Sequence, residues 1–124
     1  MPARHRDDLA GCQGRLTVTR HPDGCVLIYP RPTWEVRRDQ LSRLPFAARG
    51  LQRLLIGNAV VVDLDNAGRL LVPSELRTAA DLDGEVILCG VGAYLELWDP
   101  ERLAQREQEQ LADGLPPAAA DFTF

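Results

Sequence analysis

The chain repeats itself at a spacing of about 70 residues, and this repeat limits the folds that it can adopt. Four features recur at this spacing: a proline, an arginine, a Leu-Pro pair and an aromatic residue at the end of a predicted strand. The pairs are Pro2 with Pro73, Arg6 with Arg77 and Leu44-Pro45 with Leu115-Pro116, all 71 residues apart, and Tyr29 with Trp98, 69 residues apart. Small repeated units bury their apolar faces against one another. The sequence therefore predicts an α+β fold made by tandem duplication of one unit.

Each unit is predicted to run hairpin, short helix, second hairpin, longer helix. In the first unit, strands over 15–19 and 25–29 flank a turn that contains Pro22 and Gly24, two residue types typical of turns. Helices are expected over 3–9, from Trp34 to about Leu44 with Thr33 as the N-cap, and over 46–56 with a stop at Gly57.

The second unit begins with an apolar run, a polar turn and a second apolar run, over 60–73. Period-2 alternation around such a turn predicts a tight β-hairpin. After it we expect a short helix over 74–80, strands over 85–89 and 94–98, and a helix opened by Asp99-Pro100 that ends near Ala112.

The repeat divides the chain into four predicted segments. They are an incomplete first unit over 1–45, a connecting helix over 46–57, a second unit over 58–112 and a flexible tail over 113–124. The first unit is incomplete because the counterparts of Asp65, Gly68 and Arg69 would precede Met1. We expect a true start upstream of Met1, since a unit without its opening hairpin leaves strand edges unpaired. Loss of one copy of the hairpin is the alternative.

Composition excludes some classes of protein. The 124 residues are 45% hydrophobic and 26% charged, with a formal net charge of −4. A chain of this length forms one domain, or two small ones that share a core. The acidic balance argues against a protein that coats nucleic acid through bulk positive charge, although a few arginines repeated by oligomer symmetry could still make a local basic face. Three widely spaced cysteines and the polar N-terminus predict a cytoplasmic protein with reduced thiols.

The turn of the second unit's first hairpin has the chemistry of a recognition element. Gly68 can adopt positive φ without steric cost, and Arg69 follows it at the rim of the turn. An arginine fork suits both phosphate oxygens and the guanine edge. From the residues alone, an ion pair of Arg69 with Asp65 or Asp63 explains the presence of this arginine about as well as a contact with DNA does.

The order of these motifs resembles a known family. Asp65-x-x-Gly68-Arg69 followed by an apolar pair and a proline is similar to the signature of the SpoVT/AbrB swapped-hairpin transcription factors. Leu76-Arg77, Leu95-Glu96-Leu97-Trp98, the segment 19–25 and the run 51–55 narrow the resemblance to the MraZ family, associated with the bacterial division and cell-wall gene cluster. The resemblance covers nearly all of 2–104.

The resemblance implies a β-barrel of swapped-hairpin units, a ring-like homo-oligomer and a nucleoid-associated repressor that occupies double-stranded promoter DNA. It places Asp65, Asn66, Gly68 and Arg69 at the DNA. Arg77, Arg4 and Arg6 could add backbone contacts, although a solvated or intramolecular role is the simpler interpretation of these three.

Other classes of function have weaker support. Cys12, His21 and Cys25 lack a fourth ligand at zinc-site spacing, and neither serine lies in a triad-like context. We therefore expect no metal, no cofactor, no small-molecule substrate, no membrane partner and no enzyme. A structural oligomerisation protein that has lost DNA binding together with its N-terminal hairpin is the alternative function. The net charge favours it and the intact Arg69 motif opposes it.

We predict that Gly68→Val lowers the melting temperature and weakens DNA binding, because a β-branched residue tolerates positive φ poorly. Thermal unfolding of parent and variant checks this. An unchanged melting temperature would show that the turn does not need glycine at this position.

Overall fold

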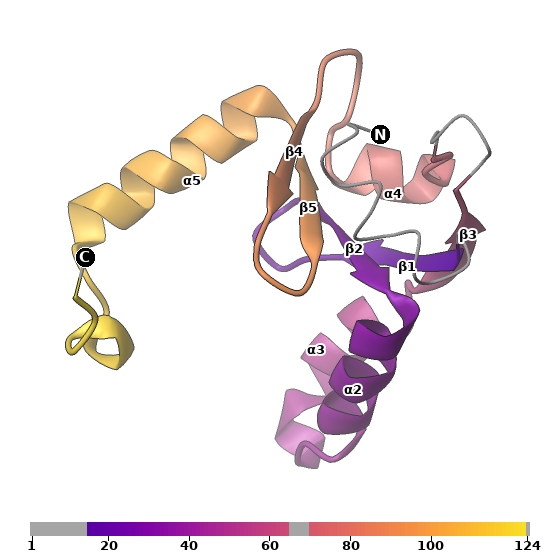
Figure 1. The fold of residues 1–124 in the computed structure, drawn as a ribbon, viewed down its shortest axis with the longest axis horizontal. Helices are drawn as coiled ribbons and strands as arrows, with labels where there is room; N and C mark the ends of the chain where they lie inside the picture. The colour runs from indigo at the N-terminus through magenta and orange to yellow at the C-terminus, as the bar shows by residue number, and fades with distance from the viewer. Residues whose placement is uncertain (1–14, 65–69, 124) are drawn as a thin grey trace.

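A computed structural model describes residues 15–64 and 70–123. These residues form an α+β fold around one five-stranded antiparallel sheet with the strand order β3-β1-β2-β5-β4 (Figure 1). The strands are β1 (Arg15–Arg20), β2 (Val26–Pro30), β3 (Val60–Asp63), β4 (Ile87–Gly90) and β5 (Leu95–Trp98). The expected α+β class is confirmed at this level.

The first hairpin forms as predicted. β1 pairs with β2 in antiparallel register, from Leu16 opposite Pro30 to Arg20 opposite Val26. The connecting turn is closed by the backbone N–H of Gly24, which donates to the carbonyl of His21 at 3.0 Å. Gly24 has φ +96°, the region where glycine avoids a steric cost. Local turn chemistry therefore fixes this hairpin.

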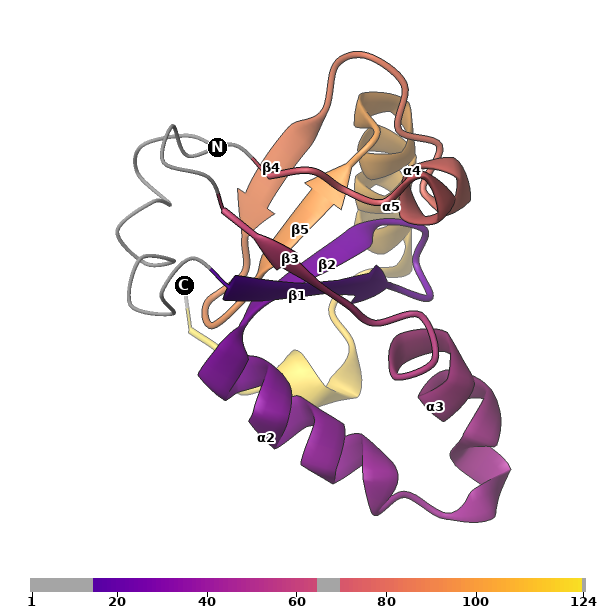
Figure 2. The ribbon, with the colours of Figure 1, turned by 90° about the vertical axis from the view of Figure 1, so that its right-hand side faces the viewer.

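Helices cover both faces of the sheet. α4 (Ser74–Ala79) lies on one side, and α2 (Arg31–Ser42) and α3 (Arg49–Leu55) project from the other (Figures 1 and 2). Successive strand residues point to opposite faces, so β2 contributes to two clusters, and β1 contributes to the first of them. The cluster under α4 contains Leu16, Val18, Val26, Ile28, Val72, Leu76, Ala80 and Leu95. The cluster facing α2 and α3 contains Leu27, Tyr29, Trp34 and Leu55.

The strand order is symmetric about the pair β2–β5. β2 pairs with β5 antiparallel, with Ile28 opposite Leu95, and β1 and β4 flank this pair on either side. β1 and β4 are the matching strands of the two predicted units, as are β2 and β5. Strands of both units thus share a single sheet, and their equivalent strands occupy equivalent places in it.

Two details of the first half differ from the sequence expectations. α2 begins at Arg31 and ends at Ser42, so Thr33 lies inside the helix, and Pro30 at the N-cap makes no side-chain cap. Pro32 explains the early start, because proline suits the first turn of a helix. The run over 46–56 is divided into the 3-10 turn η1 (Phe46–Ala48) and α3.

Asn58, rather than Gly57, caps the end of α3. Its Nδ2 donates to the carbonyl of Leu54 at 2.9 Å, which satisfies one of the acceptors left open at a helix C-terminus. Gly57 is needed for a different reason. A Cβ there would lie 2.4 Å from the carbonyl oxygen of Arg53, so any side chain would force this turn apart.

The second half follows the predicted order with shorter strands. α4 ends at Ala79, and β4 begins only at Ile87, two residues later than expected. α5 (Pro100–Asp113) opens as predicted, with Asp99 Oδ2 accepting from the backbone N–H of Arg102 at 3.1 Å. Beyond it the chain forms a second 3-10 turn, η2 (Pro117–Ala119). None of the helices in the described ranges is long and apolar enough to cross a membrane.

A buried hydroxyl joins the sheet to α3. Thr19 is fully buried, and its Oγ1 donates to the carbonyl of Leu55 at 2.6 Å. We predict that Thr19→Val lowers the free energy of unfolding by about 1–3 kcal/mol, because an almost isosteric side chain leaves a buried acceptor without its donor. Urea unfolding measures the difference.

Thr17→Val is the matched control. Thr17 is buried on the same face of β1, but the side-chain hydrogen bond from β1 to Leu55 of α3 comes from Thr19. Equal losses in the two variants would contradict the assigned role of the Thr19 hydroxyl.

Candidate nucleic-acid interface

Most of the predicted DNA-contacting residues lie outside the described residues. These are Asp65, Asn66, Gly68, Arg69, Arg4 and Arg6. The described chain does fix the flanks of the motif, because Leu64 and Leu70 form an antiparallel β-bridge. The two residues that flank the motif therefore meet at one place on the edge of the sheet.

The flanks are anchored in the core. Val62, Leu64 and Leu70 pack against the hydrophobic cluster under α4, whereas Val61 on the opposite face is 68% exposed. This alternation matches a half-buried edge strand. β3 also pairs with β1 along its whole length, so the connection that carries the motif leaves from a fixed support.

Strand register brings two arginines to the same end of the sheet as the motif. Arg15 lies opposite Asp63, the last residue of β3. Its neighbour Leu16 lies opposite Pro30, which directly precedes Arg31. Arg15 and Arg31 therefore flank the end of β3 from which the chain enters the motif.

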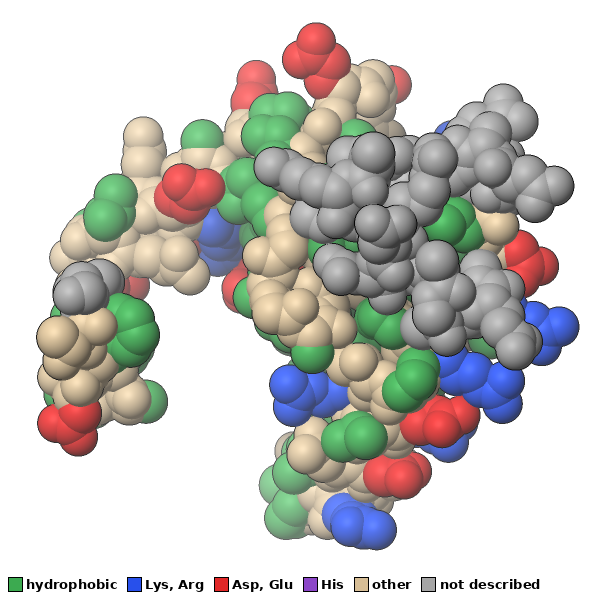
Figure 3. Space-filling view, in the orientation of Figure 1, with side chains coloured by type: hydrophobic (Ala, Val, Ile, Leu, Met, Phe, Trp, Pro, Cys, Tyr) green, Lys and Arg blue, Asp and Glu red, His purple; other side chains and the backbone are tan. Residues whose placement is uncertain are grey.

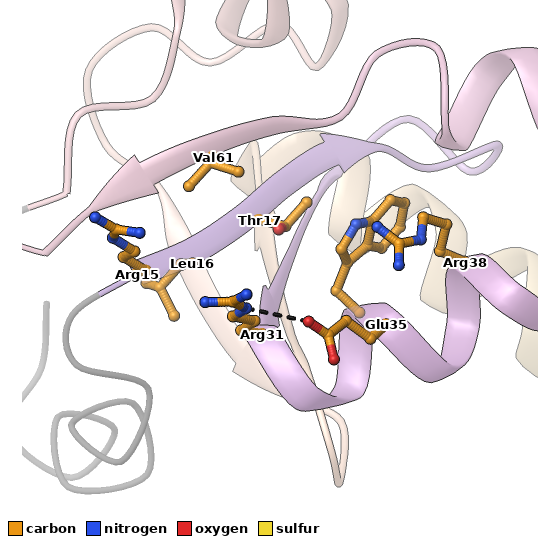
Figure 4. A pocket seen from close by; sticks show the side chains of 8 residues that line it. Arg15, Leu16, Thr17, Arg31, Glu35, Arg38 and Val61 are labelled. Carbon is orange, nitrogen blue, oxygen red and sulfur yellow. Dashed lines mark hydrogen bonds and ion pairs between the residues drawn. The ribbon is translucent and has the colours of Figure 1, made fainter.

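These arginines line a hollow beside β3. The hollow of about 280 Å³ lies between the start of β1, β3 and α2, and its lining includes Arg15, Arg31 and Arg38 (Figure 4). Figure 4 shows Arg15 and Arg31 toward one end and Arg38 toward the other. Three guanidinium groups around one hollow suit an anionic group such as phosphate.

Carboxylates moderate this positive charge. Arg31 Nε is 3.1 Å from Glu35 Oε1, and Arg15 Nε is 4.0 Å from Asp63 Oδ1. All four side chains are about half exposed or more, so solvent screens these pairs and each adds little stability. The guanidinium groups can exchange such partners for phosphate oxygens at low cost.

Arg77 is the one predicted contact residue that the structure describes. It lies exposed on α4 and lines a shallow hollow of about 320 Å³ with Asp81 and Asp83. The backbone of Arg77 closes the helix end, since its carbonyl accepts from Leu82 at 2.8 Å. Two nearby acids make Arg77 a weaker anion site than the Arg15–Arg31 end.

Within 15–64 and 70–123, the titratable groups with perturbed pKa values are stabilised in their neutral forms. Burial raises the pKa of the Cys25 thiol, with Glu96 adding to the effect. Burial also raises the pKa values of Tyr29 and Tyr94, and each phenol lies close to the other, with ring centroids 5.3 Å apart. A protonated thiol is a poor nucleophile, so Cys25 serves the core.

A polar network near the first turn is structural as well. His21 Nδ1 accepts from the backbone N–H of Asp23 at 2.9 Å, and Trp98 Nε1 donates to Glu96 Oε1 at 3.0 Å. The second Glu96 oxygen is 3.9 Å from His21 Nε2. No group of three His, Cys, Asp or Glu side chains within 15–64 and 70–123 is placed to hold a metal ion.

Sequence reasoning did not single out Arg15, Arg31 and Arg38. Arg15 starts a predicted strand, and Arg31 lies between two prolines where the helix start was misplaced. The Pro30-Arg31-Pro32 pattern was the available signal, because proline near a helix start would have put Arg31 in the first turn. Its proximity to Arg15 depends on the β1–β2 register, which no local pattern gives.

Comparison with known proteins identifies the family. The profile of the MraZ protein family matches residues 55–123. Among curated relatives, the transcriptional regulator MraZ of Herminiimonas arsenicoxydans is 50% identical over 125 aligned residues, covering 100% of this chain and 88% of the relative. The protein of the same name from Bordetella pertussis is 54% identical and that from Paraburkholderia phytofirmans 50%, each with the same coverage. The chain belongs to the MraZ family.

Proposed function

We propose that this chain is a DNA-binding transcription regulator that acts as a homo-oligomer by occupying promoter DNA in the bacterial cytoplasm, at the nucleoid. Its relatives are named transcriptional regulators, which supports the general class. The mechanism involves no chemistry on the DNA. Bound protein excludes the transcription machinery from the promoter and thereby represses the division and cell-wall genes.

The observation that carries this proposal is the bridge between Leu64 and Leu70. It holds both ends of the Asp65-x-x-Gly68-Arg69 motif at the end of β3, and Arg15 and Arg31 lie at that same end of the sheet. In the proposed complex Arg69 reads a base edge, with Asp65, Asn66 and Gly68 shaping the approach. Base contacts of this kind specify sequence.

Arg15 and Arg31 are proposed to bind the DNA backbone beside the base contact. Phosphate contacts set register and orientation without carrying sequence information. Arg77, Arg4 and Arg6 are further backbone candidates. One copy offers few such contacts, so affinity comes from several copies that engage one promoter together.

The oligomer is proposed to be ring-like and built from duplicated swapped-hairpin units over 1–45 and 58–112, joined by 46–57 and followed by a tail over 113–124. The symmetric places of β1 and β4, and of β2 and β5, support the duplication. Uncovered apolar side chains support association, among them Phe46, Leu71 and Leu111, each more than 75% exposed.

An oligomerisation protein without DNA binding is the rival function. The net charge of −4 favours it. The family match and the basic end of the sheet favour the regulator, and a binding assay separates the two.

We predict that Arg69→Ala keeps the fold and costs on the order of 1–3 kcal/mol of binding free energy per engaged copy for a base contact. These losses compound in an oligomer. Fluorescence anisotropy with promoter and scrambled duplexes at two salt concentrations measures affinity, specificity and salt dependence together.

Two further variants make the result specific. Arg15→Ala should weaken binding to both duplexes alike and flatten the salt dependence, as expected for a lost phosphate contact. Arg53→Ala removes an exposed arginine on α3, away from the motif, and should leave binding unchanged. Equal affinity of folded Arg69→Ala and parent for promoter DNA would favour the rival function.

We also predict that the apparent stability of the protein falls on dilution, because only associated copies bury the uncovered apolar side chains. Sedimentation velocity and thermal unfolding over a hundredfold range of concentration measure this. A compact, equally stable monomer at every concentration would contradict the oligomer.

A further inference from the structure

Two projections leave the central sheet in different directions. The first arm is α2, η1 and α3, residues 31–55, and the second arm is α5, η2 and the residues after it, 100–123. Figure 1 shows the two arms separated from each other. No residue of α5 is buried. Most of the surface of α5 is therefore left uncovered by the described part of the chain.

The two arms are counterparts within the repeat. α2 follows β2 and α5 follows β5, and each helix carries a Gln-Leu pair near its end, Gln40-Leu41 and Gln110-Leu111. Each is followed by a Leu-Pro pair and a 3-10 turn, η1 or η2. The two arms can therefore be compared position by position, to find side chains that are buried in one arm and exposed at the equivalent place in the other.

In the first arm α3 folds back over α2. Gln52 Nε2 donates to the carbonyl of Leu41 at 2.7 Å, and Leu41 packs against the cluster that contains Trp34 and Leu55. Because α3 supplies these contacts, Leu41 is partly buried. The end of α2 is thus covered from within its own arm.

The second arm has no counterpart of α3 within the described residues. Leu111 is 83% exposed and Leu115 is 62% exposed. They line a largely apolar hollow of about 670 Å³ together with Glu107, Gln110, Asp113, Gly114 and Pro116. A cavity of about 150 Å³ already holds benzene, so this hollow has room for an aromatic ring and its neighbours.

The tip of the first arm presents such a ring. Phe46, the first residue of η1, is 77% exposed, and the Arg49 guanidinium lies 4.4 Å from its ring centroid. Leu44 is exposed beside it, at 40%. Apolar side chains are visible on the surface of both arms in Figure 3.

The charges of the arms are complementary. The first arm carries six arginines against Glu35 and Asp39. The second carries five acidic residues against Arg102 and Arg106, and both of these arginines donate to backbone carbonyls of the body, at Gly24, Ala79 and Asp23. A second copy of this chain thus offers the partner of opposite charge that each arm lacks.

We propose that the tip of the first arm of one copy docks in the hollow of the second arm of a neighbouring copy. Phe46 enters between Leu111 and Leu115, and Arg43 and Arg49 face Glu107 and Asp113. This inference rests on the homo-oligomer of the proposed function and names its contact surfaces. The contact is heterologous, because tip and hollow are different surfaces, and a contact of that kind builds a ring when its rotation closes.

The test compares charged substitutions at the tip and in the hollow. Phe46→Asp and Leu111→Arg each place a charge in the proposed apolar contact, at positions exposed enough to leave the monomer folded. Each should raise the dissociation constant of the oligomer on the order of thirtyfold or more, the effect of losing a central interface residue. Sedimentation velocity measures association, and circular dichroism verifies folding.

Mixing the two variants makes the test specific. Phe46→Asp keeps an intact hollow and Leu111→Arg keeps an intact tip, so a mixture should form pairs that neither variant forms alone and should not extend to larger rings. Arg49→Glu combined with Glu107→Arg in one chain should recover association that each single reversal lowers.

Val36→Asp and Gln108→Arg are the matched controls. Val36 is exposed on α2 of the first arm and Gln108 is exposed on α5, and neither lines the hollow, so association should match that of the parent. An oligomeric parent whose association is unaffected by Phe46→Asp and Leu111→Arg would overturn the docking and leave the oligomer itself intact. A monomeric parent would overturn both.

Discussion

The antiparallel pairing of β2 with β5 is the contact on which the rest of the structure depends. It is the seam between the two halves of the chain, with Val26 opposite Leu97 and Ile28 opposite Leu95. The residues of 25–29 are all buried, because helices cover both faces of β2. A strand buried on both faces is apolar throughout, and this apolar run fixes which segment lies in the middle. This pair sets the positions of its neighbours β1 and β4 and of the helices that follow β2 and β5. Through β1 it also sets the position of the edge strand β3, which precedes the motif.

Features set by adjacent residues could be predicted from the sequence. The β1–β2 turn follows from Pro22 and Gly24, and the start of α5 follows from Asp99-Pro100, because each depends on interactions within a few residues. The sequence predicts Thr33 as the N-cap of α2, but the helix begins at Arg31, because Pro32 suits its first turn. Thr33 and Pro32 thus indicate different helix starts, and the structure has the one that Pro32 indicates.

The candidate site was only partly accessible to sequence reasoning, for a different physical reason. The Asp65-x-x-Gly68-Arg69 motif is contiguous and could be recognised. Arg15 and Arg31 join its surroundings only through the pairing of β1 with β3 and with β2. A register shift of one residue would turn Arg15 to the other face of the sheet. Such convergence depends on long-range pairing, which a periodic pattern does not specify.

The distribution of charge is compatible with the proposed DNA partner of this acidic chain. Six of the thirteen arginines outside the motif lie on the first arm, and docking to the acidic second arm of a neighbour would pair Arg43 and Arg49 at its tip with carboxylates. The arginines at the end of β3 have only screened, exposed carboxylate partners. The proposed assembly would therefore leave uncompensated positive potential at the end of β3, where Arg15 and Arg31 lie. The net charge of a single copy thus says little about the surface that the proposed ring would turn toward DNA, because the local field depends on which charges association leaves exposed.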